Sequence, residues 1–233
     1  MKSYRGFTLV ELAMVLFVVS LLLGGLLVPL ATQIEARQRS DAQEQLESRI
    51  REALIGFVII NGRLPCHTTE SDPTSANYGV ADPWPCTAAT NTAGWVGDGI
   101  LPWKTLGLNN GLDPWGTPRS SSSDPWTGHW RYRVDSNFSA STAFLLTTTT
   151  SDDLDVLDAD GNQLISTSER PISIIYSTGA NQSEDGENAT YEPLPANSPT
   201  YQGGVVVVDF DDITIWLTRP LLFNRMVSAG VLP

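Results

Sequence analysis

The hydrophobic pattern divides the chain into an apolar segment, an amphipathic segment and a longer mixed region. Residues 12–30 form an almost unbroken apolar run, which at about 1.5 Å per helical residue covers most of the roughly 30 Å core of a bilayer. Residues 31–61 place apolar side chains at helical spacing. A single helix is therefore predicted from Phe7 to about Ile60, with a membrane-spanning part at 7–30 and an amphipathic part at 31–61.

Residues 62–233 are predicted to form a globular α+β domain in which an antiparallel sheet packs against the amphipathic part of the helix. Asn61 and Gly62 end that helix, and the Pro-rich and Gly-rich composition of residues 62–140 indicates long loops. Strands are predicted at 130–134, 143–149, 172–176 and 205–210. Short C-terminal helices are predicted after a cap at Asp211 and Asp212, through Leu217, and from Pro220 to near Gly230.

The charge of the chain is strongly negative and unevenly placed. It holds 14 Lys and Arg against 26 Asp and Glu, for a formal charge of -12. Most of the excess acid lies after residue 63. Because nucleic-acid binding depends on basic groups that neutralise phosphates, DNA and RNA are excluded as partners of the soluble domain.

The two cysteines, Cys66 and Cys86, favour a disulfide over a metal site. Tetrahedral zinc sites use closely spaced cysteine pairs with further ligands, and the chain has two histidines, His67 and His129. In an oxidising compartment a bridge across this loop would stabilise the fold by roughly 3 kcal/mol. Two free, buried thiols are the alternative.

The N-terminus combines positive charge, a long apolar run and one carboxylate. Lys2 and Arg5 precede the run, which favours a cytoplasmic N-terminus. No small-residue cleavage site follows Leu30, so the apolar segment is expected to be retained. Glu11 is the exception within it, because an unpaired carboxylate in lipid costs several kcal/mol and requires a positive partner.

The sequence Gly6-Phe7-Thr8-Leu9-Val10-Glu11 before an apolar run resembles the leader junction of type IV prepilins and type II secretion pseudopilins. The resemblance implies a leader at 1–6, a cut between Gly6 and Phe7 by prepilin peptidase, and methylation of the new N-terminus. It also implies that Glu11 pairs with the ammonium of a neighbouring subunit and sets the register of assembly. A plain single-pass anchor is the alternative for this segment.

Gly24, Gly25 and Pro29 lie inside the apolar part of the predicted helix. Each lowers helix stability, and Pro29 also removes a backbone hydrogen bond. The family resemblance implies that this part melts locally in assembled filaments, and a packing kink is the alternative.

Calcium is considered at two acidic segments. Residues 154–162 contain several Asp and a Gly but fail the EF-hand spacing at both ends, so Asp160 and Gly161 are assigned to a hairpin turn. The second segment consists of residues 176–181 and 185–188. Together with Asp113-Pro114-Trp115-Gly116 before it, this segment is similar to the calcium-loop region of major pseudopilins. That similarity implies oxygen ligands from Asn181, Asp185 and Glu187, and a solvated acidic loop is the alternative.

These features predict a structural subunit of a type IV pilus or type II secretion pseudopilus, of the minor kind because of its length. The expected location is the inner membrane, with one span and a periplasmic domain, and then the filament or cell surface. Expected partners are other pilin or pseudopilin subunits, prepilin peptidase, the inner-membrane assembly machinery and membrane lipid.

Two other classes of function are considered. The first is an adhesin-like binding module that displays tryptophans such as Trp84, Trp95 and Trp126 on an acidic domain. The second is a membrane-anchored enzyme, but the chain lacks a G-x-S-x-G nucleophile motif and a Gly-rich phosphate loop. Asp211 and Asp212 are adjacent and do not face one another on a helix, so no enzyme activity is expected.

Overall fold

The computed structural model describes the backbone of residues 8–84, 86, 98–116, 128–140, 143–183, 185–190, 199–205 and 209–231. Side chains are described for the same residues except 23–32, 189 and 190. The chain divides into two compact units, residues 1–40 and 41–233.

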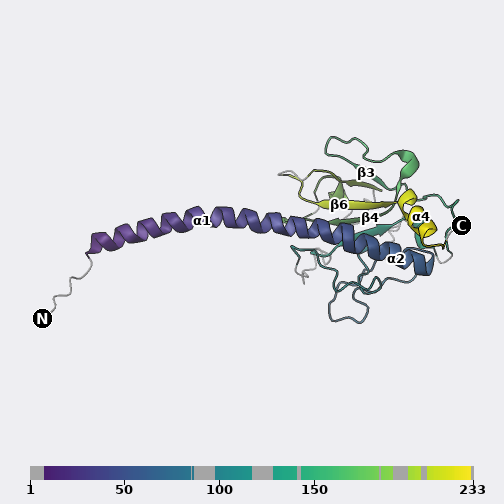
Figure 1. Ribbon diagram of the computed structural model, residues 1–233, viewed down its shortest axis with the longest axis horizontal. Helices are drawn as coiled ribbons and strands as arrows, with labels where there is room; N and C mark the ends of the chain where they lie inside the picture. The colour runs from purple at the N-terminus through teal and green to yellow at the C-terminus, as the bar shows by residue number, and fades with distance from the viewer. Residues whose placement is uncertain are drawn as a thin grey trace. The chain divides into compact units, whose positions relative to one another are not determined.

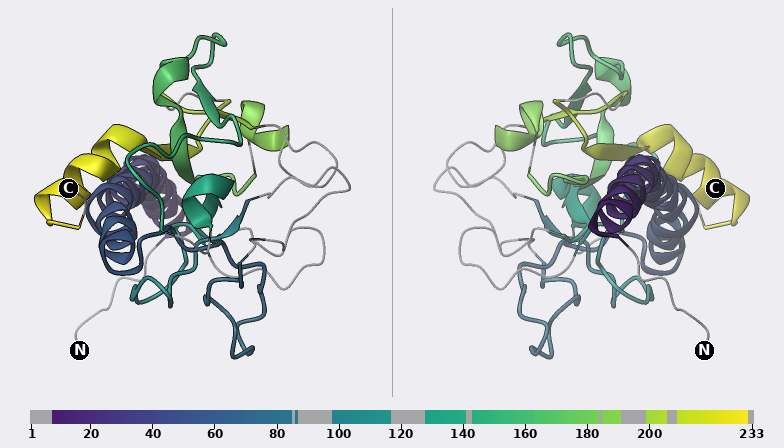
Figure 2. Two further views of the ribbon diagram at one scale, coloured as in Figure 1. Left: turned by 90° about the vertical axis from the view of Figure 1, so that its right-hand side faces the viewer. Right: turned by 90° about the vertical axis from the view of Figure 1, so that its left-hand side faces the viewer.

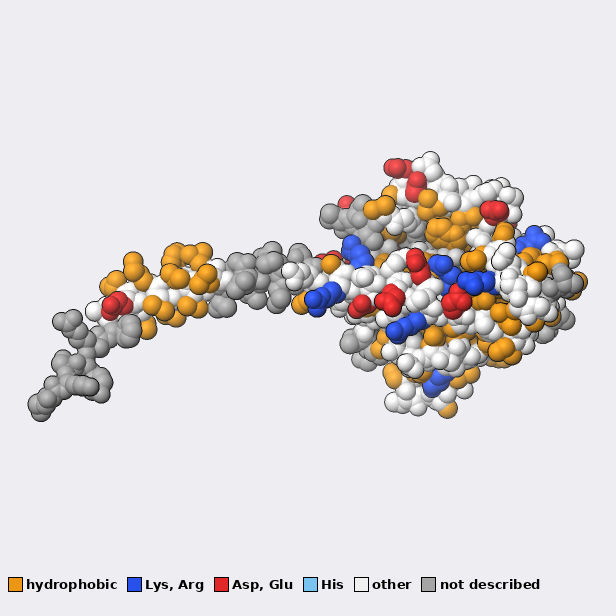
Figure 3. All heavy atoms as spheres, in the orientation of Figure 1, with side chains coloured by type: hydrophobic (Ala, Val, Ile, Leu, Met, Phe, Trp, Pro, Cys, Tyr) orange, Lys and Arg blue, Asp and Glu red, His pale blue; other side chains and the backbone are white. Residues whose placement is uncertain are grey.

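The first unit is helical from Leu9 onward, as the larger part of α1 (Leu9–Glu44; Figure 1). Its described apolar side chains are exposed, with Leu9 at 85% and Leu22 at 62%. Figure 3 shows these hydrophobic side chains along the N-terminal part of the helix. The helix thus presents an apolar surface that nothing within its own unit covers in the described part.

In the second unit the helix continues through a π-helical segment, η1 (Gln45–Ile50), into α2 (Arg51–Asn61). A stripe of buried side chains recurs every four residues, at Ala42, Leu46, Ile50, Leu54 and Val58, and Ile55 is buried beside it. In an α-helix of 3.6 residues per turn a four-residue repeat drifts around the axis. The wider turns of η1 offset that drift and keep the stripe on one face. Residues 31–61 are helical throughout.

The helix ends where the sequence predicts. Gly62 has φ 68°, a left-handed conformation, and its backbone N–H donates to the carbonyl of Val58. Glycine takes this conformation without a side-chain penalty, so it closes the last turn.

The main sheet has four antiparallel strands in the order β1-β2-β4-β6. Its strands are β1 (Gly99–Ile100), β2 (Arg131–Val134), β4 (Pro171–Ser177) and β6 (Ile213–Thr218). Tyr132 pairs with Ile175, and Ile175 pairs with Ile215. The strands predicted at 130–134 and 172–176 are confirmed. The predicted α+β fold, a helix with an antiparallel sheet, is confirmed as well.

Both faces of the sheet are buried. Alternate residues of a strand point to opposite faces, and Tyr132 and Val134 pack with the buried stripe of the helix. On the opposite face, Tyr176 and Ile174 pack with Tyr201 in a second cluster. The buried pair Arg131 and Asp98 lies on this second face, at 2.7 Å, and Tyr176 donates a hydrogen bond to the same carboxylate.

Smaller elements complete the second unit. β3 (Asp155–Leu157) and β5 (Thr200–Gln202) form a two-stranded parallel sheet. α4 (Arg219–Ser228), which begins with Pro220 in its first turn as predicted, contacts α2 and lies beside it in Figure 2. The short helices are α3 (Ser136–Ser139), η2 (Thr167–Glu169) and η3 (Gly186–Thr190).

Two predicted elements between residues 205 and 217 are wrong in the described part. Asp211 and Asp212 do not cap a helix, because the alternation of Ile213, Ile215 and Leu217 with more exposed residues forms strand β6 instead. The strand predicted at 205–210 is absent from its described residues: Val205 is 84% exposed and follows a bend at Gly204, with φ 122°. Residues 206–208 lie outside the described part.

The strand predicted at 143–149 is also wrong, because these residues form a turn. Phe144 turns inward and packs on Phe138 at a centroid distance of 4.9 Å, whereas Leu145 is 64% exposed. The Thr148 hydroxyl accepts a hydrogen bond from the Leu145 backbone N–H. Such local side-chain bonds compete with strand pairing. The turn predicted at Asp160 and Gly161 is observed, with the Gly161 N–H donating to the Asp158 carbonyl.

The long loops are fixed by a disulfide and by aromatic packing. Cys66 and Cys86 are bonded, with their Cα atoms 5.2 Å apart. Further along, the Lys104 ammonium lies 5.3 Å from the Trp103 ring centroid and 6.0 Å from that of Tyr78. The Tyr78 hydroxyl is hydrogen-bonded to His129 at 2.7 Å. The disulfide predicted from the cysteine spacing is thus present.

Candidate functional site

Thr8 and Glu11 form a capping box at the start of α1. The backbone N–H and the hydroxyl of Thr8 donate to Glu11 Oε2, at 3.0 and 2.9 Å. The backbone N–H of Glu11 donates in return to Thr8 Oγ1 at 3.3 Å. This arrangement satisfies backbone donors that a helix leaves open at its N-terminus. The Thr-x-x-Glu spacing is its sequence signal, and it adds Thr8 to the predicted Glu11.

The predicted processing residues Gly6 and Phe7 lie outside the described residues. The predicted membrane-spanning part, 7–30, lies there in part as well, because the side chains of 23–30 are not described. Among the residues that are described, no helix combines the length and the apolar character needed to cross a membrane.

A cluster of three carboxylates lies at the opposite end of the sequence, where the loop after β4 meets the residues before β6. Asp185, Asp211 and Asp212 each place an oxygen within 4.8 Å of the others. Asp212 is buried, whereas Asp185 and Asp211 are half-buried. Like charges this close repel, so the cluster requires compensation from hydrogen-bond donors or from a cation.

Backbone and amide donors hold one side of each carboxylate in the cluster. Asp211 Oδ2 accepts from the N–H groups of Ala180 and Asn181, at 2.7 and 2.9 Å. Asp212 Oδ2 accepts from the Asp185 N–H at 3.1 Å and from Asn188 Nδ2 at 2.8 Å. These bonds tie the loop after β4 to the start of β6 and fix the carboxylates in place.

The other oxygens of two of these carboxylates are buried without compensation. Asp211 Oδ1 and Asp212 Oδ1 have no hydrogen-bond partner among the described residues. Burial raises the pKa of Asp212 to about 8, against hydrogen bonds that lower it. Burial likewise raises the pKa of Asp211. A buried carboxylate oxygen without a donor is costly, and a cation removes that cost.

The residues present fit a hard cation such as Ca²⁺. Calcium is bound by carboxylate, amide and carbonyl oxygens at flexible geometry, and Asp185, Asp211 and Asp212 supply three carboxylates with two unsatisfied oxygens. When bound, the ion would supply the positive charge that the cluster lacks. The carboxylates themselves then hold the loop after β4 against β6.

The arrangement differs from the predicted ligand set of Asn181, Asp185 and Glu187. Asp185 is in the cluster, but Asn181 donates its Nδ2 to Asp185 at 3.0 Å, and its Oδ1 accepts from the Ser183 N–H at 2.7 Å. Glu187 is exposed and outside the cluster. The sequence predicts Asp211 and Asp212 as a helix cap, and it therefore does not predict them as neighbours of Asp185.

The Trp residues named for a binding platform are described only in part. Trp84 is 47% exposed, while Trp95 and Trp126 lie outside the described residues. A clustered aromatic platform therefore stays an untested alternative.

The chain combines an N-terminal helix that has an exposed apolar surface with an α+β domain. Residues 1–27 match the family model described as the prokaryotic N-terminal methylation motif. The chain therefore carries the signature of type IV pilins and pseudopilins. No curated protein and no solved structure matches this chain.

Proposed function

We propose that the protein is a minor structural subunit of a type IV pilus or a type II secretion pseudopilus. The observation that carries the proposal is the methylation motif at residues 1–27. Prepilin peptidase cuts between Gly6 and Phe7, and the inner-membrane assembly machinery inserts the subunit into a filament of other pilin or pseudopilin subunits. Before assembly the segment 7–30 anchors the subunit in inner-membrane lipid, with residues 62–233 in the periplasm.

The exposed apolar surface of α1 supports assembly through this helix. Side chains from Leu9 to Leu22 are mostly more than half exposed within the described chain. Exposed apolar surface of this extent is covered by lipid or by partner helices. The same surface therefore serves the membrane-anchored state and the filament in turn.

The capping box supports a specific role for Glu11. Thr8 follows Phe7 directly in the sequence, so a cut after Gly6 places the new ammonium next to the capping residue. Thr8 holds the Glu11 carboxylate by two hydrogen bonds. In an apolar surrounding this carboxylate neutralises the ammonium of a neighbouring subunit, which sets the axial register.

Calcium binding at Asp185, Asp211 and Asp212 belongs to the same proposal. The two unpartnered oxygens, Asp211 Oδ1 and Asp212 Oδ1, support it. A bound ion would hold the loop after β4 to β6 and so stabilise the displayed domain. The Cys66–Cys86 disulfide fits the same proposal, because disulfides persist in an oxidising, extracytoplasmic environment. No catalytic role is proposed for any residue.

Mass spectrometry of the mature N-terminus, combined with filament purification, tests the assembly proposal. The chain is produced with the peptidase and assembly machinery, as wild type and as Glu11→Ala. We expect a methylated Phe7 terminus in both, and a strong loss of Glu11→Ala from filaments. Glu44→Gln removes a carboxylate from an exposed position of the same helix and should leave incorporation unchanged. An intact Met1 terminus would contradict processing, and undiminished incorporation of Glu11→Ala would contradict its role in register.

A further inference from the structure

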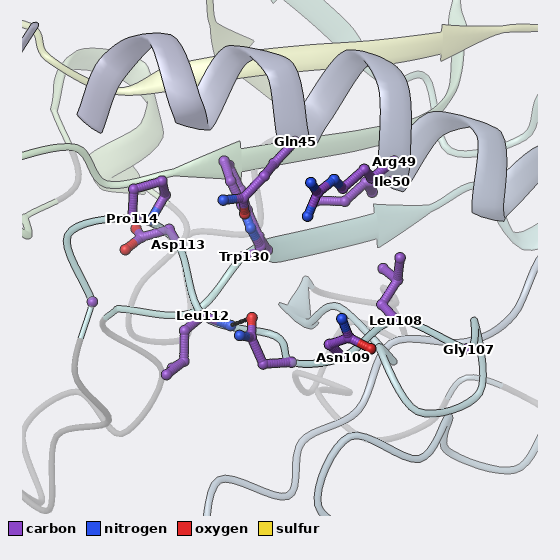
Figure 4. A pocket seen from close by; sticks show the side chains of 12 residues that line it. Gln45, Arg49, Ile50, Gly107, Leu108, Asn109, Leu112, Asp113, Pro114 and Trp130 are labelled. Carbon is purple, nitrogen blue, oxygen red and sulfur yellow. Dashed lines mark hydrogen bonds between the residues drawn. The ribbon is translucent and has the colours of Figure 1, made fainter. Parts of the chain in front are cut away.

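A polar pocket of about 770 Å³ lies between the π-helical segment η1 and the loop of residues 107–116. Figure 4 shows Gln45 and Arg49 extending from the helix, with Asn109 and Leu112 on the loop across from them. Its volume is within the range of small-molecule sites. The pocket shares no residue with the carboxylate cluster.

The π-helical geometry brings the helix side of the pocket together. Hydrogen bonds from residue i to i+5 bring residues four and five apart onto one face, so Gln45, Arg49 and Ile50 all line the pocket. Ile50 is buried, while Arg49 is exposed and its side chain extends along the pocket side of the helix (Figure 4). Short π segments are frequent at functional sites because they redirect side chains in this way.

The polar side chains of the pocket have open hydrogen-bonding capacity. Within the described chain, Arg49 has no ion-pair partner, and the Gln45 and Asn109 carboxamides make no hydrogen bond. Asn110 Oδ1 accepts from the Leu112 N–H at 3.3 Å, which leaves its Nδ2 available. Three carboxamides and one guanidinium therefore face a space that a ligand can fill.

The rest of the lining is apolar and half-buried. Leu108, Leu112 and Pro114 expose part of their surface to the pocket, and the buried ring of Trp130 lies behind them. Mixed walls of this kind suit a ligand with both polar groups and C–H surface. A purely ionic ligand would leave the apolar part without a contact.

The pocket holds one cation and one acid although the whole chain is strongly acidic. Arg49 is the cation among the lining residues, and Asp113 is the acid. The Asp113 carboxylate accepts hydrogen bonds from the Ser177 hydroxyl at 2.5 Å and the Trp115 N–H at 3.1 Å. Burial raises the pKa of Asp113, and the hydrogen bonds from Ser177 and Trp115 engage both of its carboxylate oxygens. The guanidinium of Arg49 is left to attract an anion.

We propose that this pocket binds an acidic saccharide, such as a uronic acid residue of a glycan. The Arg49 guanidinium matches a carboxylate, because its planar fork donates two parallel hydrogen bonds. The carboxamides of Gln45, Asn109 and Asn110 both donate and accept, as sugar hydroxyls require. The C–H faces of the sugar ring lie against Leu112 and Pro114. The volume holds one or two sugar rings.

Calorimetric titration of the full chain in detergent micelles tests this site with D-glucuronate as the probe. We expect saturable binding with a roughly millimolar dissociation constant, as is usual for a single sugar with few contacts. D-Glucose keeps the sugar ring but lacks the carboxylate. Acetate keeps a carboxylate but lacks the sugar ring, and inorganic phosphate lacks both. Each should bind at least about tenfold more weakly, because a charge-assisted hydrogen bond or several hydroxyl contacts are lost.

Two substitutions separate the pocket from general charge effects. Arg49→Gln should weaken glucuronate binding by about tenfold or more, and Asn109→Ala should weaken both glucuronate and glucose. Arg37→Gln removes the same charge from an exposed residue that does not line the pocket and should leave binding unchanged. Circular dichroism confirms that each variant is folded.

The proposal is overturned by any of three results. Wild-type chain that shows no saturable response to glucuronate excludes the site. Arg49→Gln with wild-type affinity excludes the carboxylate anchor. Acetate or phosphate that binds as tightly as glucuronate shows an anion site without saccharide recognition. Because these titrations use the unassembled chain, they are independent of processing and of filament assembly.

Discussion

The Ser177 hydroxyl donates a hydrogen bond of 2.5 Å to Asp113 Oδ2 and joins the end of β4 to the loop that lines the pocket. Both residues are buried. A second bond, from Gln182 Nε2 to the Trp115 carbonyl at 3.0 Å, joins the same loop to the segment beside the carboxylate cluster. The pocket loop and the carboxylate cluster are thus attached to the same strand end.

Removal of the Ser177 hydroxyl should destabilise the fold. Ser177→Ala leaves Asp113 Oδ2 buried without its donor, which is expected to cost about 1–3 kcal/mol in urea unfolding. Ser173→Ala on the same strand is the matched control, because Ser173 Oγ is buried with no partner in the described structure. It should be neutral or stabilising. Equal losses for the two variants would show that the hydrogen bond to Asp113 is unimportant.

Calcium should raise the thermal midpoint of the chain and change its pH dependence. Without metal, the raised pKa of Asp212, about 8 against an ordinary 3.8, favours the protonated folded state. Its contribution to stability is therefore present below pH 3.8 and is lost as pH rises toward 8. At a free Ca²⁺ concentration about a hundredfold above the dissociation constant, binding should add about 2.7 kcal/mol to the free energy of unfolding. It should also remove the loss of stability between pH 3.8 and 8.

Scanning calorimetry at several pH values, with Ca²⁺ or with a chelator, measures this effect. Asp212→Asn should abolish most of the gain from Ca²⁺ and flatten the metal-free pH profile. Asp158→Asn is the control, since Asp158 lies outside the cluster and is bonded to its own turn at Asn162. A calcium response that survives in Asp212→Asn would place the ion elsewhere.

His67 should make the domain sensitive to acid. It is fully buried, and both ring nitrogens lack a partner among the described residues. Burial lowers the pKa of His67 from 6.5 to about 4, while Asp98 opposes the shift and Arg131 and Arg133 add to it. Its contribution to stability is therefore present above pH 6.5 and is lost as pH falls toward 4.

Urea unfolding of His67→Leu between pH 4 and 7 checks this prediction. The substitution removes two unsatisfied polar atoms, so the variant should show a smaller loss of stability over that range than the wild type. His129→Leu provides the comparison: His129 is also buried, but it is hydrogen-bonded to Tyr78, and its loss should lower stability. Parallel pH profiles for wild type and His67→Leu would exclude His67 as the source.

The disulfide should contribute strongly to stability. Replacing both Cys66 and Cys86 by Ala is expected to cost about 3 kcal/mol, because a loop of 20 residues is no longer closed in the unfolded chain. Unfolding with and without a reductant measures this, and only the wild type should respond to it. If the double variant is as stable as the oxidised wild type, the disulfide does not stabilise the fold.

The sequence predicted the elements whose signals are local. Helical spacing and Gly62 located the end of the long helix, and the runs at 130–134 and 172–176 located β2 and β4. The segment before β6 was misassigned because Asp211 and Asp212 resemble a helix cap when read alone. The two-residue alternation from Ile213 onward is the competing signal, and pairing with β4 decides between them.

The candidate sites were predicted less completely, because they depend on contacts between distant residues. Asp185 was predicted by resemblance to a family loop, whereas Asp211 and Asp212 join it only through strand pairing that brings the two segments together. The pocket has no sequence motif. Its groups come from a helix at Gln45 and Arg49 and from a loop some 60 residues later, and the π-helical turn that aligns them carries no recognisable spacing.

Lys104, which lies over the Trp103 ring, offers a site for chemical labelling. The chain contains two lysines, Lys2 and Lys104, and the proposed cut after Gly6 would remove the first. Lys104 is exposed, so an amine-reactive dye would label one lysine side chain on each processed chain. Since the indole of Trp103 lies next to that position, the label would be held beside an aromatic ring without any engineered residue.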